Sequence, residues 1–291
     1  MKKLFLFIGV SLTLLLVGCG KAEPQITVGV FREDQGKYEL AEQYYKLVVD
    51  GREHEAVRSL ISAGRETLDL AEHYYKLAAD SGDLGAQTSL GLLYYNQQKR
   101  DLAEHYYKLA ADSGHTLAQY FLGFLYVSQE KLDLAEHYYK LAADKGNTAA
   151  QSLLGSLYDD QKKYGLAELY WKLAADSGNT SAQLDLGILY RYQEKYNLAE
   201  FYWKLAADGE YALAQSFLGS LYKDQGKYDL AEQHYKLAID DGYFRARLDL
   251  GSLYEDQGKY DLAEHYYKLA IDGGDPTAQR RLEALYRRLG K

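Results

Sequence analysis

The apolar residues of this chain follow a helical spacing that short polar segments interrupt at regular intervals. In residues 86–112, the side chains of Ala86, Leu90, Leu93 and Tyr94 fall on one face of a helix. A polar turn then breaks the spacing before a second helical pattern begins. We call the first predicted helix of such a unit the A helix and the second the B helix.

The B helix of this unit is expected to run from about Lys99 or Arg100 to Asp112. Gly114 follows its end and suits the left-handed backbone conformation that terminates helices. The wide apolar face predicted for this helix consists of Leu102, Ala103, Tyr106, Tyr107, Leu109, Ala110 and Ala111.

The eleven-residue phrase that begins at Leu102 recurs along almost the whole sequence. Its first step is 30 residues and its next six steps are 32 residues each. A constant period in this range indicates a solenoid, in which each unit buries its apolar face only against its neighbours. The copies begin at Leu40, Leu70, Leu102, Leu134, Leu166, Leu198, Leu230 and Leu262.

A glycine recurs in the middle of the A helices, at Gly91 and at the same position of five later units. A glycine inside a helix costs about 1 kcal/mol relative to alanine. A cost that is repeated in every unit predicts a packing reason, namely close contact between the A and B helices. We expect Ala103 to be the other small residue at this contact.

Residues 1–18 read as a secretory signal, because Lys2 and Lys3 precede an apolar run and small residues. An uncleaved membrane anchor is the alternative, although the apolar run from Leu4 to Val17 is shorter than the roughly 20 residues that span a bilayer.

The segment Leu16-Val17-Gly18-Cys19 resembles the lipobox of bacterial lipoproteins, and Cys19 is the only cysteine. The resemblance implies cleavage before Cys19, its lipidation, and anchoring by acyl chains, with residues 19–25 as a lipidated tether. It also implies export to the bacterial envelope: the periplasmic side of the outer membrane in a Gram-negative source, or otherwise the outer face of the cell membrane.

The repeats resemble two related families. The residues from Leu218-Gly219 to Tyr228-Asp229-Leu230-Ala231 are similar to the tetratricopeptide repeat. The Ala-Ala-Asp-x-Gly ends followed by Ala-Gln are similar to the Sel1-like repeat, although a period of 32 is shorter than is usual in either family. The resemblance implies an all-α, right-handed α-solenoid superhelix of about eight repeats over residues 26–291. Residues 276–290, where Glu283 replaces the glycine, are expected to form a polar C-terminal capping helix.

The charge and the chemistry of the chain narrow its function. A net charge of −8 without a basic block argues against nucleic acid as the main partner. No glycine-rich phosphate loop, serine elbow or metal-ligand spacing is present, so we expect no catalytic, cofactor or metal site. Four histidines, one per unit, fit better as copies of a half-exposed B helix position than as metal ligands: His73, His105, His137 and His265.

The tyrosine pairs of the B helices, such as Tyr106 and Tyr107, could form an aromatic binding strip. We expect a structural role instead, with one ring of each pair buried between repeats and the other partly covered.

Positions that vary while the scaffold stays constant are the better candidates for binding. In the tetratricopeptide register, the groove-facing positions of the A helices include an apolar, aromatic set in the N-terminal half: Leu92, Tyr95, Tyr120, Phe124 and Val127. The same positions later in the chain carry Ile188 and Arg191. The alternative is that these side chains merely fill a tightly wound superhelix.

The sequence therefore predicts a non-enzymatic scaffold, anchored to the envelope through Cys19, that binds a protein or peptide in the groove of a solenoid. The alternative is an envelope enzyme or ligand-binding protein that acts on peptidoglycan or a β-lactam. Some Sel1-like proteins have been linked to β-lactam binding, but they are rich in cysteine and this chain is not.

Overall fold

The computed structural model describes residues 65–209 and 211–291, and every regular element in these ranges is an α-helix. The B helices are α4 (Arg65–Asp80), α6 (Arg100–Asp112), α8 (Leu132–Asp144), α10 (Tyr164–Asp176), α12 (Tyr196–Asp208), α14 (Tyr228–Asp240) and α16 (Tyr260–Asp272). The A helices are α5 (Leu84–Asn96), α7 (Thr116–Ser128), α9 (Thr148–Asp160), α11 (Thr180–Tyr192), α13 (Ala212–Asp224), α15 (Ala246–Asp256) and α17 (Pro276–Leu289).

These bounds confirm the predicted all-α repeat architecture. The signal segment of residues 1–18, Cys19 with the tether to residue 25, and the first copy at Leu40 lie outside the described residues. The handedness of the superhelix stays a prediction. No helix in the described ranges combines the length and the apolar character needed to cross a membrane.

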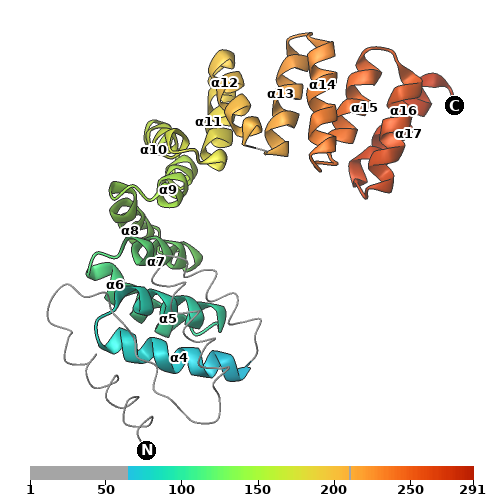
Figure 1. The fold of residues 1–291 in the computed structure, drawn as a ribbon. Coiled ribbons are helices and arrows are strands. Elements are labelled where there is room, and N and C mark those ends of the chain that lie inside the picture. Colours follow the sequence, from blue (N-terminus) through green and yellow to red (C-terminus); the bar gives the residue numbers. More distant parts are fainter. Residues whose placement is uncertain (1–64, 210) are drawn as a thin grey trace, which may run out of the picture. The chain divides into compact units, whose positions relative to one another are not determined.

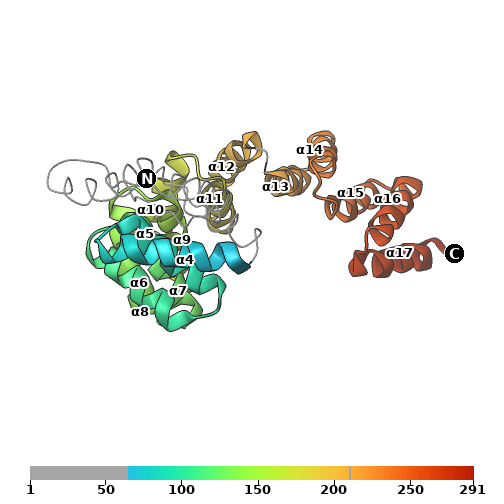
Figure 2. The same cartoon turned by 60° about the horizontal axis from the view of Figure 1, so that its bottom comes forward.

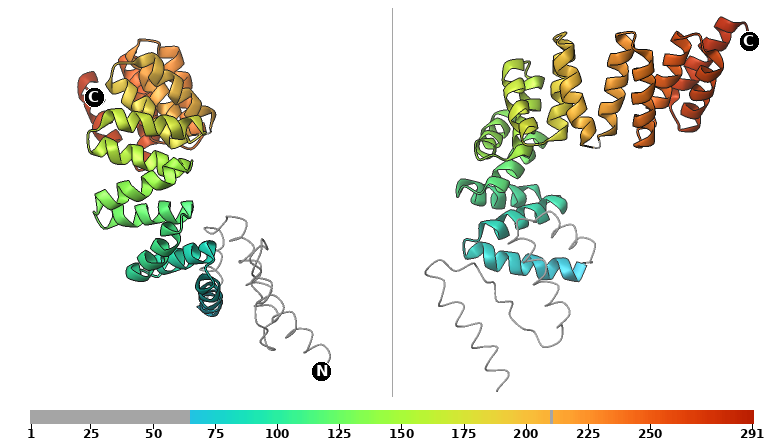
Figure 3. Two further views of the ribbon diagram at one scale, coloured as in Figure 1. Left: turned by 90° about the vertical axis from the view of Figure 1, so that its left-hand side faces the viewer. Right: turned by 45° about the horizontal axis from the view of Figure 1, so that its top comes forward.

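The chain divides into two compact units, residues 1–150 and 151–291. In the first unit, α5 packs on α6, α6 on α7 and α7 on α8 (Figure 1). Within the second unit, each helix from α10 to α17 packs on the next, with α13 and α14 seen as one pair and α15 and α16 as another (Figures 2 and 3). Contacts also join α5 to α7, α13 to α15 and α15 to α17. Successive A helices therefore form a shared face within each unit.

The repeated glycine lies where the A and B helices of one unit meet, as predicted, but its close neighbour is an aromatic ring. A Cβ atom built on Gly123 would lie 2.6 Å from Cδ1 of Tyr139. Gly91 faces Tyr107 in the same way. The nearest atoms belong to the second ring of the aromatic pair of the B helix. At Gly251 the backbone oxygen of Ala263, the counterpart of Ala103, also lies 3.4 Å from the added Cβ.

The buried stripe of the B helix is narrower than the sequence indicated. In α6 the buried side chains are Ala103, Tyr107, Ala110 and Ala111. Leu102 and Leu109 each remain 43% exposed. The close approach that glycine permits leaves room for alanines and one ring, so the leucines lie at the edge of the contact.

The aromatic pairs are structural, as predicted. The second ring, Tyr107 in α6, is buried, whereas Tyr106 is half-buried and stacks on Tyr94 of α5 with ring centroids 5.6 Å apart. A further contact joins neighbouring repeats, because the Tyr126 hydroxyl of α7 donates a hydrogen bond of 3.0 Å to the Glu104 carboxylate of α6. The same bond recurs at Tyr94 and Glu72, Tyr190 and Glu168, Tyr222 and Glu200, and Tyr286 and Glu264.

The termini of the helices also follow the sequence. Gly114 has a φ of +88°, the left-handed conformation expected after α6. The last helix, α17, begins at Pro276 after Asp275, whose side chain accepts a hydrogen bond from the Thr277 backbone N–H. It ends at Gly290 with a φ of +69°, and Glu283 is exposed. The predicted polar capping helix is thus confirmed.

Candidate functional site

A small apolar hollow lies on the A-helix face of the first unit. Its volume is about 110 Å³. Four of the five predicted groove residues of this half line it, together with two rings of the repeat core, so that the lining consists of Leu92, Tyr95, Tyr107, Tyr120, Phe121 and Phe124. We call this feature the aromatic hollow.

The side chains of the aromatic hollow differ in exposure. Leu92 is buried and Tyr95 and Tyr120 are half-buried, whereas Phe124 is 43% exposed. The rings of Tyr95 and Phe124 meet edge to face with centroids 6.1 Å apart, which connects α5 to α7. Val127, the fifth predicted residue, is 39% exposed on α7 and does not line the hollow. Part of the predicted set thus fills the superhelix, and part of it is open to contact.

The chemistry of the aromatic hollow suits an apolar side chain. Burial raises the pKa of Tyr120, so its hydroxyl remains neutral and can donate a hydrogen bond at any physiological pH. No charged side chain lines the hollow.

Ile188 and Arg191, the predicted residues of the second unit, lie on α11 and line a larger pocket of about 750 Å³. Tyr192, Trp203, Phe217 and others contribute to the same walls. Nη2 of Arg191 is 2.7 Å from Oδ2 of Asp224 on α13. Arg191 therefore forms a bridge between two A helices in addition to its place in the pocket.

A second pocket of the same unit, of about 650 Å³, contains Ile188 of the predicted set and a carboxylate, Asp185, that the predicted groove positions did not include. Its lining brings three carboxylates together with aromatic rings and consists of Ser156, Asp159, Asp160, Tyr164, Trp171, Asp185, Ile188, Leu189, Tyr192 and Gln193. We call it the acidic pocket. A signal was present in the sequence: Asp185 stands at the register position that Phe121 and Phe217 occupy in other repeats.

The carboxylates of the acidic pocket have raised pKa values. Burial, with a further contribution from the charge of Asp159, raises the pKa of Asp185 to about 6. Burial and the charge of the neighbouring Asp160 also raise the pKa of Asp159. Both shifts express the cost of holding negative charge away from water and beside like charge.

Of the five histidines on the described B helices, the four predicted ones are exposed, and three of these contact the first ring of the adjacent aromatic pair: His105, His137 and His265. Within residues 65–209 and 211–291 there is no group of three His, Cys, Asp or Glu side chains arranged to hold a metal ion.

Comparison with known proteins places two units of the chain in a family. The tetratricopeptide repeat model matches residues 212–240 and 244–272, which correspond to α13 with α14 and to α15 with α16. No curated protein matches the sequence.

Solved structures share the fold over most of the chain. One is a protective antigen of uropathogenic Escherichia coli strains that displays an SLR fold, with a TM-score of 0.65, 22% identity and coverage of 89% of this chain. This chain spans 61% of the length of that antigen. A second is a Sel1 repeat protein from Oxalobacter formigenes, with a TM-score of 0.56, 23% identity, and coverage of 79% of this chain and 96% of that protein. A third is PilW, a type IV pilus biogenesis factor, with a TM-score of 0.54, 19% identity, and coverage of 68% of this chain and 98% of that protein.

At these identities the likeness shows the fold. Together with the family match over two of its units, it shows that the chain has the repeat fold of Sel1-like and tetratricopeptide-like proteins.

Proposed function

We propose that this protein is a non-enzymatic scaffold that is anchored to the bacterial envelope through lipidated Cys19 and binds another protein or peptide on its A-helix face. The repeat fold, which is typical of protein-interaction scaffolds, supports the general part of this proposal. The observation that carries the specific part is the aromatic hollow, since it combines a buried floor with exposed apolar residues at variable positions.

The expected contact is an apolar side chain of the partner that enters the hollow between Tyr95 and Tyr120 and covers Phe124. Full burial of one such side chain contributes about 1.5 to 3 kcal/mol. Aromatic residues around a desolvated pocket commonly dominate the binding energy of an interface. A few anchors of this kind would therefore determine the affinity.

Binding is tested by immobilising the mature chain, capturing polypeptides from the envelope, and comparing it with a Tyr120→Ala, Phe124→Ala double variant. We expect the original protein to retain a specific polypeptide that the double variant does not retain. Leu109→Ala is the matched control, because Leu109 is as exposed as Phe124 but lies on a B helix. The proposal is wrong if no polypeptide is retained, or if the double variant retains it as well as the original protein does.

Anchoring is tested separately with Cys19→Ala. This variant should lose acyl labelling and move from the membrane fraction to the soluble fraction, because no other residue offers the thiol that lipidation requires. Unchanged fractionation would contradict the lipoprotein assignment, but it would not bear on the proposal that the groove binds a partner.

A further inference from the structure

The acidic pocket lies where one repeat has an aspartate at a register position that carries an aromatic ring in two other repeats. Phe121 of α7 stacks on Tyr107 with centroids 5.5 Å apart, and Phe217 of α13 stacks on Trp203 at 5.1 Å. Asp185 of α11 occupies the same register position over Trp171 of α10. The aspartate thus places a carboxylate where those repeats have a ring, and this carboxylate lines a pocket of about 650 Å³.

The charges around this pocket have one sign. Asp159 and Asp160 from α9 and Asp185 from α11 line it, and no lysine, arginine or histidine is among the lining residues. Burial and the charge of Asp159 raise the pKa of Asp185, because both oppose its ionised form. At neutral pH the pocket therefore presents negative charge beside the aromatic side chains of Tyr164, Trp171 and Tyr192.

The equivalent site two repeats later shows how the fold compensates such a carboxylate. Asp249 stands 64 positions after Asp185, and Ser216 donates a hydrogen bond of 3.3 Å to it. The charges of Arg245 and Lys223 also favour the ionised form of Asp249, although burial raises its pKa overall.

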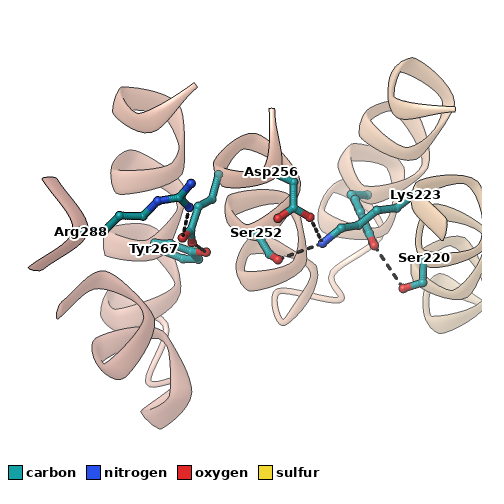
Figure 4. Close-up of polar contacts among 8 residues, drawn as sticks. Ser220, Lys223, Ser252, Asp256, Tyr267 and Arg288 are labelled. Carbon is teal, nitrogen blue, oxygen red and sulfur yellow. Dashed lines mark hydrogen bonds and ion pairs between the residues drawn. The ribbon is translucent and has the colours of Figure 1, made fainter. Parts of the chain in front are cut away.

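Lys223 stands 64 positions after Asp159, so the site of Asp249 has a lysine where the acidic pocket has a carboxylate. Figure 4 shows Lys223 between α13 and α15, where its Nζ atom is 2.9 Å from Ser252 Oγ and 2.8 Å from Asp256 Oδ2. One repeat thus has a cation at this position, whereas the other has a carboxylate and no basic residue in the lining of its pocket.

We propose that the acidic pocket binds a lysine or arginine side chain of a partner polypeptide. The inference deepens the proposed function and rests on it for the identity of the ligand as a polypeptide. The carboxylates would pair with the cationic group, and the aromatic lining would add cation–π attraction and contact with the aliphatic stem. Tyr192, which is 85% exposed, lines both this pocket and its neighbour around Arg191 and can pack against the entering chain.

An organic cation fits this lining better than a metal ion does. Metal ions such as Ca²⁺ need six or more oxygen ligands at fixed distances. The pocket is wide and partly aromatic, and the acidic residues of the described chain form no group suited to a metal. Its mixed lining of carboxylates and aromatic rings suits the charged head and the aliphatic stem of a long basic side chain.

The test uses nuclear magnetic resonance of the full chain labelled with ¹⁵N. The protein has two tryptophans, so two indole signals report on the two large pockets: Trp171 lines the acidic pocket and Trp203 its neighbour. The probes are the peptides acetyl-Gly-Lys-Gly-amide and acetyl-Gly-Arg-Gly-amide, with acetyl-Gly-norleucine-Gly-amide as the uncharged control. We expect saturable shifts of the Trp171 signal with at least one basic probe, and binding of the norleucine probe that is at least about tenfold weaker.

Two substitutions should abolish the response. Asp185→Asn removes the central charge, and Asp159→Lys installs the cation that the fold already accepts at Lys223. Asp249→Asn, at the equivalent position of another repeat, should leave the response unchanged. Circular dichroism and the Trp203 signal confirm that each variant is folded.

The inference is overturned if Trp171 does not respond to either basic probe, if norleucine binds equally well, or if Asp159→Lys retains binding. Capture on the aromatic hollow could still succeed in each of these cases, so failure here is distinguishable from failure of the proposed function. Conversely, if a basic probe binds here while the capture experiment fails, the pocket is supported as a cation site and the scaffold proposal is contradicted.

Discussion

Replacing Gly123 by leucine introduces four carbon atoms into a contact between α7 and α8 that has no room for them. The first of these atoms, Cβ, would lie 2.6, 2.8 and 3.0 Å from three ring carbons of Tyr139. Carbon atoms in favourable contact are about 3.5 to 4.0 Å apart. The ring would have to move by roughly 1 Å, yet Tyr139 is buried and Tyr120 lies against it with centroids 6.3 Å apart.

Two opposing effects determine the size of the change. Leucine is a better helix former than glycine by about 1 kcal/mol, which stabilises the variant. Overpacking a buried contact costs about 1 to 3 kcal/mol, and the larger value applies here because the leucine adds three atoms beyond the clashing Cβ. We expect a net loss of about 2 kcal/mol in the free energy of unfolding.

The assay is urea unfolding followed by far-ultraviolet circular dichroism, with amide hydrogen exchange to localise the effect in α7 and α8. Gly165→Leu is the matched control, because Gly165 lies in α10 and no heavy atom lies within 4 Å of a Cβ built there. That variant should be as stable as the original protein or more stable, by up to about 1 kcal/mol.

A second substitution tests the physical cause. Tyr139→Ala removes the ring, so adding Gly123→Leu to it should cost much less than adding Gly123→Leu to the original protein. Equal costs in the two backgrounds, or a Gly123→Leu variant that unfolds at the same urea concentration as the original protein, would refute the explanation of the repeated glycine.

Two further predictions concern stability. Asp185→Asn should stabilise the protein at pH 7 by up to about 3 kcal/mol, because a pKa near 6 in place of about 4 means that the folded state holds the ionised carboxylate at a cost. In the original protein, ionisation of Asp185 costs folding free energy as pH rises from about 4 to 6. The urea midpoints of the two proteins should therefore converge near pH 4. A constant difference from pH 4 to 7 would contradict the assignment. Tyr126→Phe should destabilise by about 1 kcal/mol, because it removes the hydrogen bond to Glu104 between repeats. Tyr192→Phe, at an exposed hydroxyl, should leave the urea midpoint unchanged, and equal midpoints for both variants would show that the bond contributes nothing.

Much of the fold could be predicted because the repeat supplies the same evidence many times. The helix bounds around the turn before Arg100, the glycine after α6 and the close contact at Gly91 all follow from a period and from local helix chemistry. A single unit would have left each of these ambiguous. Repetition converts a weak local preference into a reliable structural assignment.

What could not be predicted depends on which atoms face each other across helices. The apolar pattern of the B helix does not say that the ring of Tyr107 lies nearest to the glycine, nor that Leu102 and Leu109 lie at the edge. That choice depends on how the helices are rotated against one another, which periodicity fixes only to within a residue or so.

The candidate site was predicted in part. The register located four residues of the aromatic hollow, because positions that vary on a constant scaffold stand out in the sequence. The register did not single out Asp185 of the acidic pocket, since an aspartate in place of a phenylalanine has meaning only when the ring beneath it is known. Asp185 becomes informative once Trp171 is seen to lack the cover that Phe217 gives Trp203.

The most direct test of the binding face is photo-crosslinking from two positions of equal exposure. A photoreactive benzoylphenylalanine is placed at Phe124 on the A-helix face or at Leu109 on the B-helix side, each of which is 43% exposed, and the protein is irradiated in the cells that produce it. We predict a discrete adduct from position 124 that Tyr95→Ala and Tyr120→Ala weaken, and no such adduct from position 109. The proposal that the A-helix face binds the partner would be contradicted by equal adduct yields from both positions. It would also be contradicted if neither substitution lowers the yield of the adduct from position 124.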